Sequence, residues 1–128
     1  MSNMQLPHNH GQAVEQELEN MPSTDDFQTA ANIFKPLSAC STIRIFWLLC
    51  HCEECVINLS AMVNMSSPAI SHHLKQLKAA NLIVSRREGK EVYYKASSSM
   101  SAQLLHHMIE QMVAITCPAG SPYKGGPA

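Results

Sequence analysis

Three thiols lie within six residues, in the segment Cys50-His51-Cys52-Glu53-Glu54-Cys55. Thiolates select soft metal ions, and three sulfur atoms can complete the pyramid that As(III) or Sb(III) adopts. Zn²⁺ is also held by thiolates in proteins. Cys50, Cys52 and Cys55 are therefore candidate ligands for such an ion. Cys117 could add a fourth donor.

Two other interpretations of these cysteines stay open. Free cysteine is among the most buried residue types, so Cys50 can be a packed core thiol. Cys52 and Cys55 would then be only two thiols without a third ligand. Paired exposed thiols can also close a disulfide, which would make the segment a redox or reactive-sulfur sensor. The start of the chain lacks the pattern of a signal peptide, and no apolar run approaches the ~18 residues of a membrane span. We therefore expect a cytoplasmic protein whose five cysteines are not a disulfide framework.

The segment Ser66–Ala80 has a second kind of chemistry. An apolar stripe recurs at helical spacing and consists of Ile70, Leu74, Leu77 and Ala80. The rest of the circumference carries hydroxyl, imidazole, amide and cationic side chains: Ser71, His72, Lys75, Gln76 and Lys78. Pro68 suits the first helical position, so Ser67 is the expected N-cap and Ser66 the alternative. Such a helix suits contact with DNA, although an ordinary amphipathic helix has the same pattern.

The residues that follow, Leu82–Lys95, predict a β-hairpin. β-branched and aromatic side chains flank a polar centre, and Gly89 supplies the turn. Basic side chains lie near its tip: Arg86, Arg87 and Lys90. Between Ser66 and Lys95, six cations and two acids give a local charge of +4, in a chain whose net charge is −1. A helix followed by a basic hairpin is the layout of a winged helix-turn-helix, and the local charge is typical of a protein that binds DNA phosphates.

Further helices must position these two elements. They are expected to begin at Ala13, at Ser23–Asp26, at Ser41 or Thr42, at Cys55 and at Met100. The helix from Ser41 or Thr42 is apolar almost all round, so we expect it to be buried. The short helix Cys55–Asn64 is joined to the next by Met65-Ser66, the tight turn of a helix-turn-helix.

The last helix, Met100–Thr116, has an apolar face too broad for a small monomer to bury. The face comprises Leu104, Leu105, Met108, Ile109, Met112, Val113 and Ile115. We expect the same helix of a second copy to cover it. A homodimer through the first and last helices would present two recognition helices to successive major grooves of DNA.

The length and composition fit one folded domain, with 128 residues of which 45% are hydrophobic and 15% charged. Residues 1–22 form an acidic N-terminal lead that we expect to be flexible. Residues 23–117 are expected to form the winged-helix domain for DNA binding and dimerisation. The Gly/Pro-rich residues 118–128 are expected to be a loose tail.

Three blocks resemble the bacterial ArsR/SmtB family of metal- and stress-sensing repressors. Glu53–Leu59 is similar to the family's E-L-C-V-(C/G)-D-L block, Ser67–Leu74 to its S-Q-P-x-V-S-H-H-L signature, and Arg86–Tyr94 to its wing. The resemblance implies a mainly α-helical homodimer with a small β-hairpin before its last helix. It also implies that the homodimer binds an inverted-repeat DNA operator and that an inducer lowers its affinity for that operator. The expected DNA contacts are Ser66, Ser67, Ala69, Ser71, His72, Lys75, Gln76, Arg86, Arg87 and Lys90.

The family's metal sites are only partly present. The positions of its zinc-type site on the last helix hold Ser98, Met100, Gln111 and Ala114, which are not a zinc ligand set. Its thiol pair is also incomplete, because Cys55 keeps the first position and Ile57 replaces the second. The inducer expected here is therefore a soft metal or metalloid ion, such as Zn, Cd, Pb, As(III) or Sb(III), held by the Cys50–Cys55 segment.

His106 and His107 could be ligands in a remodelled interface site together with Glu110. Such residues are more often polar members of a dimer seam. An enzyme of the thiol oxidoreductase type is not expected, because it would place its reactive cysteine beside a βαβ unit and the chain has no parallel-sheet pattern. A winged helix that contacts only proteins is also disfavoured, because it has no use for six clustered cations.

Overall fold

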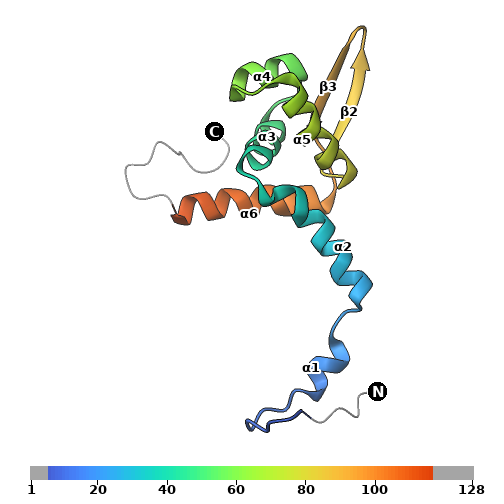
Figure 1. Ribbon diagram of the computed structural model, residues 1–128, viewed down its shortest axis with the longest axis vertical. Coiled ribbons are helices and arrows are strands. Elements are labelled where there is room, and N and C mark those ends of the chain that lie inside the picture. The colour runs from blue at the N-terminus through green and yellow to red at the C-terminus, as the bar shows by residue number, and fades with distance from the viewer. Residues whose placement is uncertain (1–5, 117–128) are drawn as a thin grey trace. The chain divides into compact units, whose positions relative to one another are not determined.

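The computed structural model describes residues 6–116 and is mainly α-helical with one small antiparallel sheet (Figure 1). Its elements are α1 (Glu15–Asn20), α2 (Thr24–Phe34), a 3-10 helix (Lys35–Ser38), α3 (Cys40–His51), β1 (Glu54–Cys55), α4 (Val56–Val63), α5 (Ser67–Ala79), β2 (Ile83–Glu88), β3 (Glu91–Ala96) and α6 (Met100–Thr116). The described part of the chain divides into two compact units, with the division between Ala31 and Asn32. The expected fold class is confirmed.

The N-terminal unit contains α1 and most of α2. The start of α2 is a reciprocal capping box: the Asp26 N–H donates to Ser23 Oγ and the Ser23 N–H donates to Asp26 Oδ2, both at 3.2 Å. Asp25 and Asp26 also lie in the first turn, where the helix dipole favours negative charge. The cluster Ser23–Asp26 therefore begins a helix as predicted.

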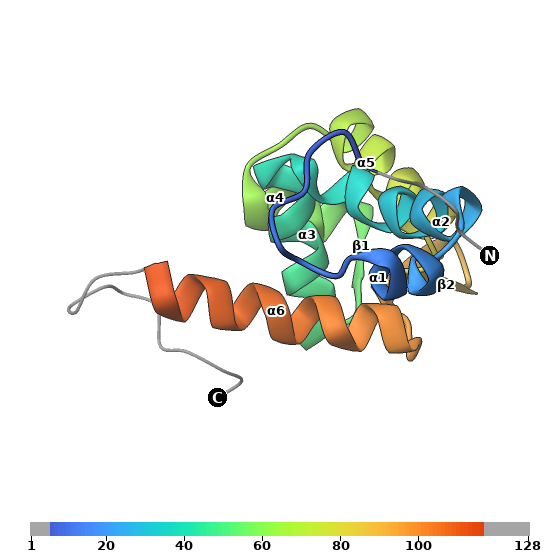
Figure 2. The same cartoon turned by 90° about the horizontal axis from the view of Figure 1, so that it is seen from below.

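The core of the second unit forms around α3, which contacts α4, α5, α6 and β3. Figure 2 shows α6 passing the end of α3. The buried side chains are Ile45, Phe46, Leu49, Leu59, Val63, Ile70, Leu74, Leu77, Leu82, Ile83, Ala102 and Leu105. α3 was expected to be buried because it is apolar almost all round. Ile45, Phe46 and Leu49 are buried, whereas Trp47 and Leu48 are half-buried.

A tight turn joins α4 to α5. Asn64 ends α4 in the left-handed region, with φ +56°, and the Met65 N–H bonds the Ser60 carbonyl at 3.1 Å. Ser66 is the N-cap of α5, because its extended backbone directs its Oγ to accept the Ala69 N–H at 3.3 Å. The expectation that Ser67 is the N-cap was wrong, and the alternative is confirmed. Ser67 is the first residue of the helix.

Ser66→Ala is expected to lower the free energy of unfolding by about 1 kcal/mol, the usual cost of removing an N-cap acceptor. Ser67→Ala is the matched control and should have a smaller effect, since its side chain does not cap the helix. Urea unfolding followed by circular dichroism measures both. Equal losses for the two variants would contradict the assignment of the cap.

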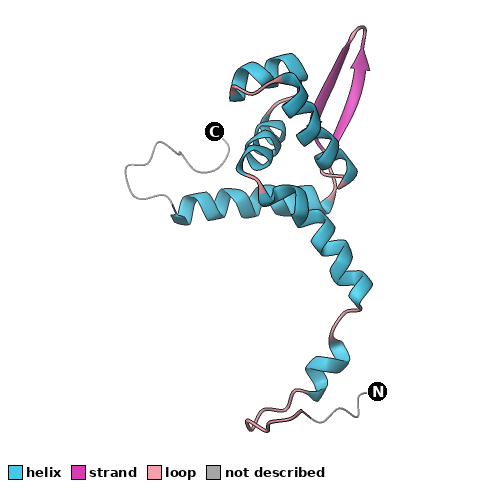
Figure 3. Cartoon of the chain, viewed as in Figure 1, coloured by secondary structure: helices cyan, strands magenta, loops and turns pink. Residues whose placement is uncertain are grey.

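The hairpin matches its prediction (Figure 3), and the additional strand β1, labelled in Figure 2, joins its sheet. β2 pairs with β3 in antiparallel register, from Ile83 opposite Ala96 to Glu88 opposite Glu91, and Gly89 adopts φ +63° in the turn. β1 pairs with the other edge of β3, so that Cys55 lies opposite Tyr93. The predicted helix Cys55–Asn64 is present as α4, with Cys55 as its N-cap and Asn64 as its C-cap. Cys55 belongs to a strand, and α4 begins at the next residue.

α6 spans Met100–Thr116 as predicted, and Ser99 Oγ accepts the Ala102 N–H at 3.1 Å. Leu105 is 4% exposed and packs into the core of its own chain, so its predicted place in a dimer seam was wrong. Four other residues of the predicted apolar face are exposed on α6 together with Met100, so that the exposed stripe is Met100, Leu104, Met108, Met112 and Ile115. We call these five residues the α6 stripe.

Within residues 6–116, no single helix has the length and apolar composition to cross a membrane. The pair of helical segments 24–38 and 40–51, bent by 97°, meets that test only jointly.

Candidate nucleic-acid interface

α5 is fixed by its apolar side and free on its polar side. Ile70, Leu74 and Leu77 are buried, and α5 contacts both α4 and β2 (Figure 1). The predicted contact residues of α5 and its N-cap are exposed, except Ala69, which is half-buried: Ser66, Ser67, Ser71, His72, Lys75 and Gln76. Hydroxyl, imidazole, amide and ammonium groups are donors and acceptors that can read base edges or hold phosphates.

His73 has a different role from its neighbour His72. Its Nδ1 lies 2.8 Å from Oγ1 of Thr42, which is fully buried in α3. The bond satisfies a buried hydroxyl and connects α5 to α3. The expected DNA contact His72 is exposed, whereas His73 packs within the protein.

Arg86 is engaged within the protein. Its guanidinium donates to both carboxylate oxygens of Glu53 at 2.9 Å, is paired with Glu88, and lies 4.9 Å from the centre of the Tyr93 ring. The hydrogen bonds to Glu53 and Glu88 raise the pKa of Arg86, and the hydrogen bond from Arg86 lowers the pKa of Glu53. Arg86 therefore holds the wing against the segment that precedes β1.

Arg87 and Lys90 are the exposed cations near the tip of the wing. Within the described residues neither has a recorded hydrogen bond or ion pair, in contrast to Lys78, whose Nζ donates to Ser85 Oγ at 2.6 Å. The wing thus presents two unpaired charges beside the exposed face of α5. Such charges suit DNA phosphates.

The structure does not gather the three thiols of the Cys50–Cys55 segment. Among the described residues, the only cluster of three His, Cys, Asp or Glu ligand atoms within 4.8 Å of one another is His51, His106 and Glu110. Cys55 is buried in β1, and Cys52 Sγ donates to the Leu48 carbonyl at 3.2 Å. Cys117 lies outside the described residues.

Cys50 and Cys52 are held in their thiol forms. Burial raises the pKa of Cys50 to about 12, with a further contribution from the negative charge of Glu110. Burial also raises the pKa of Cys52, aided by Glu54. Because the thiolate is the reactive and metal-binding form, an ion must displace a proton to bind either sulfur.

Alkylation should therefore be slow at Cys50 and fast at the exposed Cys40. Between pH 8 and 10 the rate at Cys50 should keep rising about tenfold per pH unit, because the thiolate fraction grows until the pH passes a pKa of about 12. Iodoacetamide labelling with peptide mass mapping measures this rate. A rate at Cys50 that levels off below pH 10 would contradict the raised pKa.

The convergence of His51, His106 and Glu110 was not predicted. The sequence did suggest His106 and Glu110, which lie four residues apart on α6, as ligands with His107. His51 was noted only as a neighbour of the thiols. Its contact with α6 joins residues 55 positions apart, and no local pattern encodes that contact.

Comparisons with known proteins agree with this arrangement. Residues 43–85 match the model of the bacterial regulatory protein arsR family. The chain is 30% identical over 103 residues to the transcriptional repressor SmtB homolog of Synechocystis sp., covering 80% of this chain and 78% of that protein. It is 31% identical over 96 residues to the arsenic resistance transcriptional regulator ArsR2 of Pseudomonas putida, covering 74% and 79%.

A solved structure, reduced HlyU from Vibrio cholerae N16961, superposes with a TM-score of 0.62 at 27% identity and covers 80% of this chain and 99% of that one. Two of these three proteins are transcriptional regulators by name, and the third is similar in fold. None is named as an enzyme, in agreement with the expectation from the sequence. The chain belongs to the ArsR family of bacterial regulatory proteins.

Proposed function

We propose that the chain is a transcriptional repressor that binds an inverted-repeat DNA operator as a homodimer and is released by a thiophilic metal or metalloid ion. The observation that carries DNA binding is the exposed polar face of α5 beside the unpaired cations Arg87 and Lys90. Such a protein acts on bacterial DNA, so we place it in the cytoplasm.

The division of roles at the interface follows from which side chains are free. Ser71, His72 and Gln76 lie on the exposed face of α5 and are assigned to base edges, together with Ser66, Ser67, Ala69 and Lys75 around the start and side of the helix. Arg87 and Lys90 are assigned to phosphates. Arg86 is assigned to holding the wing, because Glu53 and Glu88 already occupy its donors.

Dimerisation is supported by the α6 stripe. Leu104 is 62% exposed, Met112 56% and Ile115 79%, on a helix whose other side packs into the core. Phe34 near the end of α2 is also exposed, at 54%. Large apolar side chains gathered on one helix face suit an interface between two copies.

The test of DNA binding is fluorescence anisotropy with a labelled fragment from the promoter of the protein's own gene, over a range of salt concentrations. Arg87→Ala and Lys90→Ala should each weaken specific and non-specific binding and lower the salt slope by about one unit, the value for one lost phosphate contact. His72→Ala should weaken specific binding more than non-specific binding.

Gln28→Ala, exposed on α2 and not one of the proposed contact residues, is the control and should bind as the parent does. An unchanged salt slope in both Arg87→Ala and Lys90→Ala would reject the wing as a phosphate contact. No specific binding by the parent would reject the proposed function itself.

Ion sensing is supported by the three thiols at the end of α3 and by the relationship to a protein named as an arsenic resistance regulator. Because the three sulfurs do not form a cluster, an ion that bound all three would have to rearrange residues 50–55. An ion whose affinity differs between two arrangements of a protein can shift the equilibrium between them.

A further inference from the structure

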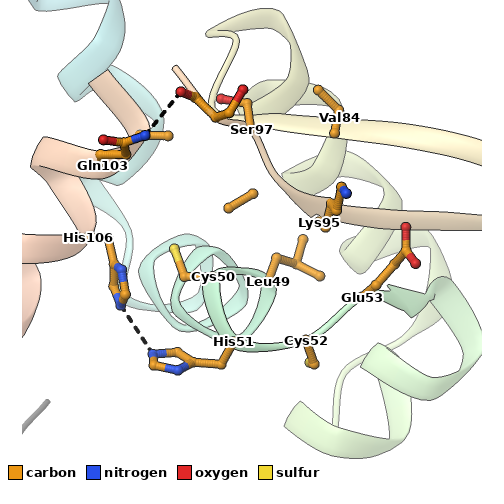
Figure 4. Close-up of a pocket in the computed structure, with 13 residues that line it drawn as sticks. Leu49, Cys50, His51, Cys52, Glu53, Val84, Lys95, Ser97, Gln103 and His106 are labelled. Carbon is orange, nitrogen blue, oxygen red and sulfur yellow. Dashed lines mark hydrogen bonds between the residues drawn. The ribbon is translucent and has the colours of Figure 1, made fainter. Parts of the chain in front are cut away.

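We propose that His51, His106 and Glu110 form a second ion site, for a divalent transition-metal ion such as Zn²⁺, Ni²⁺ or Co²⁺, which connects the end of α3 to α6. The Nε2 atoms of the two histidines are 3.1 Å apart. His51 Nε2 lies 3.5 Å from Glu110 Oε2, and His106 Nε2 lies 3.5 Å from Glu110 Oε1. Figure 4 shows the two imidazoles pointing toward each other.

These distances fit a shared ion. Zinc bonds to histidine nitrogen and carboxylate oxygen are about 2.0–2.2 Å, so neighbouring ligand atoms in a tetrahedral shell are about 3.3–3.5 Å apart. The observed separations of 3.1 and 3.5 Å are close to that edge length, with Glu110 facing each histidine through a different carboxylate oxygen. α6 sets part of the geometry, because His106 and Glu110 lie four residues apart on one helix face.

The carboxylate of Glu110 gives the site its charge. Glu110 is 7% exposed, and among the described residues no lysine or arginine is paired with it. Its recorded partners are the two imidazoles and the indole N–H of Trp47, which donates to Oε2 at 3.2 Å. A buried carboxylate is unfavourable without a compensating cation, and a divalent ion would supply one.

The two histidines give an ion access. Their side chains are 23% and 25% exposed, and both line a cavity of about 550 Å³ (Figure 4). Without metal, one Nε2 must donate a proton to the other across the 3.1 Å contact. For an ion to bind the lone pairs of both Nε2 atoms, the histidine that donates would take its other tautomer, with its proton on Nδ1.

The donor set decides the class of ion. Two imidazoles and a carboxylate suit Zn²⁺, Ni²⁺ and Co²⁺, whereas As(III) and Sb(III) need thiolates. Cys50 also lines the cavity, but its sulfur is not part of the cluster of ligand atoms that His51, His106 and Glu110 form. The site is therefore separate from the thiol site of the proposed function and does not depend on it.

The position of the site links it to DNA binding. His51 lies in α3, the helix whose Thr42 bonds His73 of α5, while His106 and Glu110 lie in α6, which carries the α6 stripe. An ion that joins α3 to α6 would restrain the recognition helix relative to the proposed dimer interface. This last step rests on the proposed function, whereas ion binding does not.

The chain contains its own reporter for the test. Trp47 is the only tryptophan, and its ring centre lies 4.2 Å from that of His51. We expect Ni²⁺ or Co²⁺ to quench its fluorescence at one ion per chain in the reduced, DNA-free protein. The Co²⁺ complex should show ligand-field bands without a sulfur-to-cobalt charge-transfer band.

Ligand variants make the assignment specific. His106→Gln and Glu110→Gln should weaken Ni²⁺ binding by at least about tenfold, since even loss of an outer-shell partner commonly has that effect. Gln at position 110 can still accept the Trp47 N–H, so the fold is retained and circular dichroism should be unchanged. His107→Gln, exposed on the same helix, is the matched control and should bind as the parent does.

Equal affinity in the parent, His106→Gln and Glu110→Gln would overturn the site. So would a sulfur-to-cobalt band that disappears in Cys50→Ser, because the ion would then be on the thiols. Operator binding by the metal-free protein is measured separately. A protein that binds DNA but no Ni²⁺ rejects this site alone, and one that binds Ni²⁺ but no DNA rejects the proposed function alone.

Discussion

Leu104→Asp is expected to give a folded monomer that no longer binds the operator, whereas Leu105→Asp is expected to unfold the chain. Leu104 is 62% exposed in the α6 stripe, so a charge there interferes only with a second copy. Leu105 is 4% exposed in the core. Loss of a buried leucine alone costs about 2–5 kcal/mol, and a buried unpaired carboxylate adds to that loss. The total can reach the whole stability of a small domain, about 5–15 kcal/mol.

Sedimentation velocity, urea unfolding and operator binding distinguish the two outcomes. Ala114→Asp is the control, because it is exposed on α6 but off the stripe by helical spacing. A dimer of Leu104→Asp that binds the operator as the parent does would reject the α6 stripe as the interface. A folded Leu105→Asp would contradict the placement of that residue in the core.

The sequence predicted the elements whose signals are local. The capping residues Ser23 and Ser99 mark the starts of α2 and α6, and Gly89 marks the turn of the wing. In each case a side chain or backbone preference acts within a few residues of itself. The apolar stripe of α5 was also predictable, because helical periodicity places Ile70, Leu74 and Leu77 on one side.

Apart from the N-cap of α5, which is Ser66 and not Ser67, errors occurred where the outcome depends on packing between distant segments. β1 forms because Glu54 and Cys55 pair with Tyr94 and Tyr93, a contact across about forty residues that two positions cannot encode. α6 is apolar on more than one side, so composition did not reveal that Leu105 faces the core and Leu104 faces outward.

The separation of residues along the sequence did not predict which candidate ligands lie close together in the structure. Cys50, Cys52 and Cys55 are close in sequence, but α3 ends at His51 and the chain then becomes extended, so the three sulfurs are not gathered. His51 and His106 are far apart in sequence and meet because α3 packs against α6. The end of α3 at His51 explains why the sulfurs are not gathered, and the packing of α3 against α6 explains why the two histidines meet.

Cys52→Ser combined with Cys55→Ser is expected to retain operator binding and to lose release by a thiophilic ion such as As(III) or Cd²⁺. In the parent, an ion that draws these sulfurs together must break the bond from Cys52 Sγ to the Leu48 carbonyl and displace residues next to β1 and α4. α4 directly precedes α5, so the recognition helix would move. Coupling between an effector and DNA is commonly about 1–3 kcal/mol, or about 5–150-fold in operator affinity.

The measurement is operator anisotropy during anaerobic titration with each ion, and the control is Cys40→Ser, which is exposed at the start of α3 and should respond as the parent does. Because Cys55 is buried, Cys52→Ser with Cys55→Ala serves as a second variant that keeps this position apolar. By reciprocity, bound operator must weaken ion binding to the parent by the same factor. If the same ion concentration released both double variants and the parent from the operator, the thiols would have a structural role and no role in sensing. The ion that acts on DNA binding would then be sought at His51, His106 and Glu110.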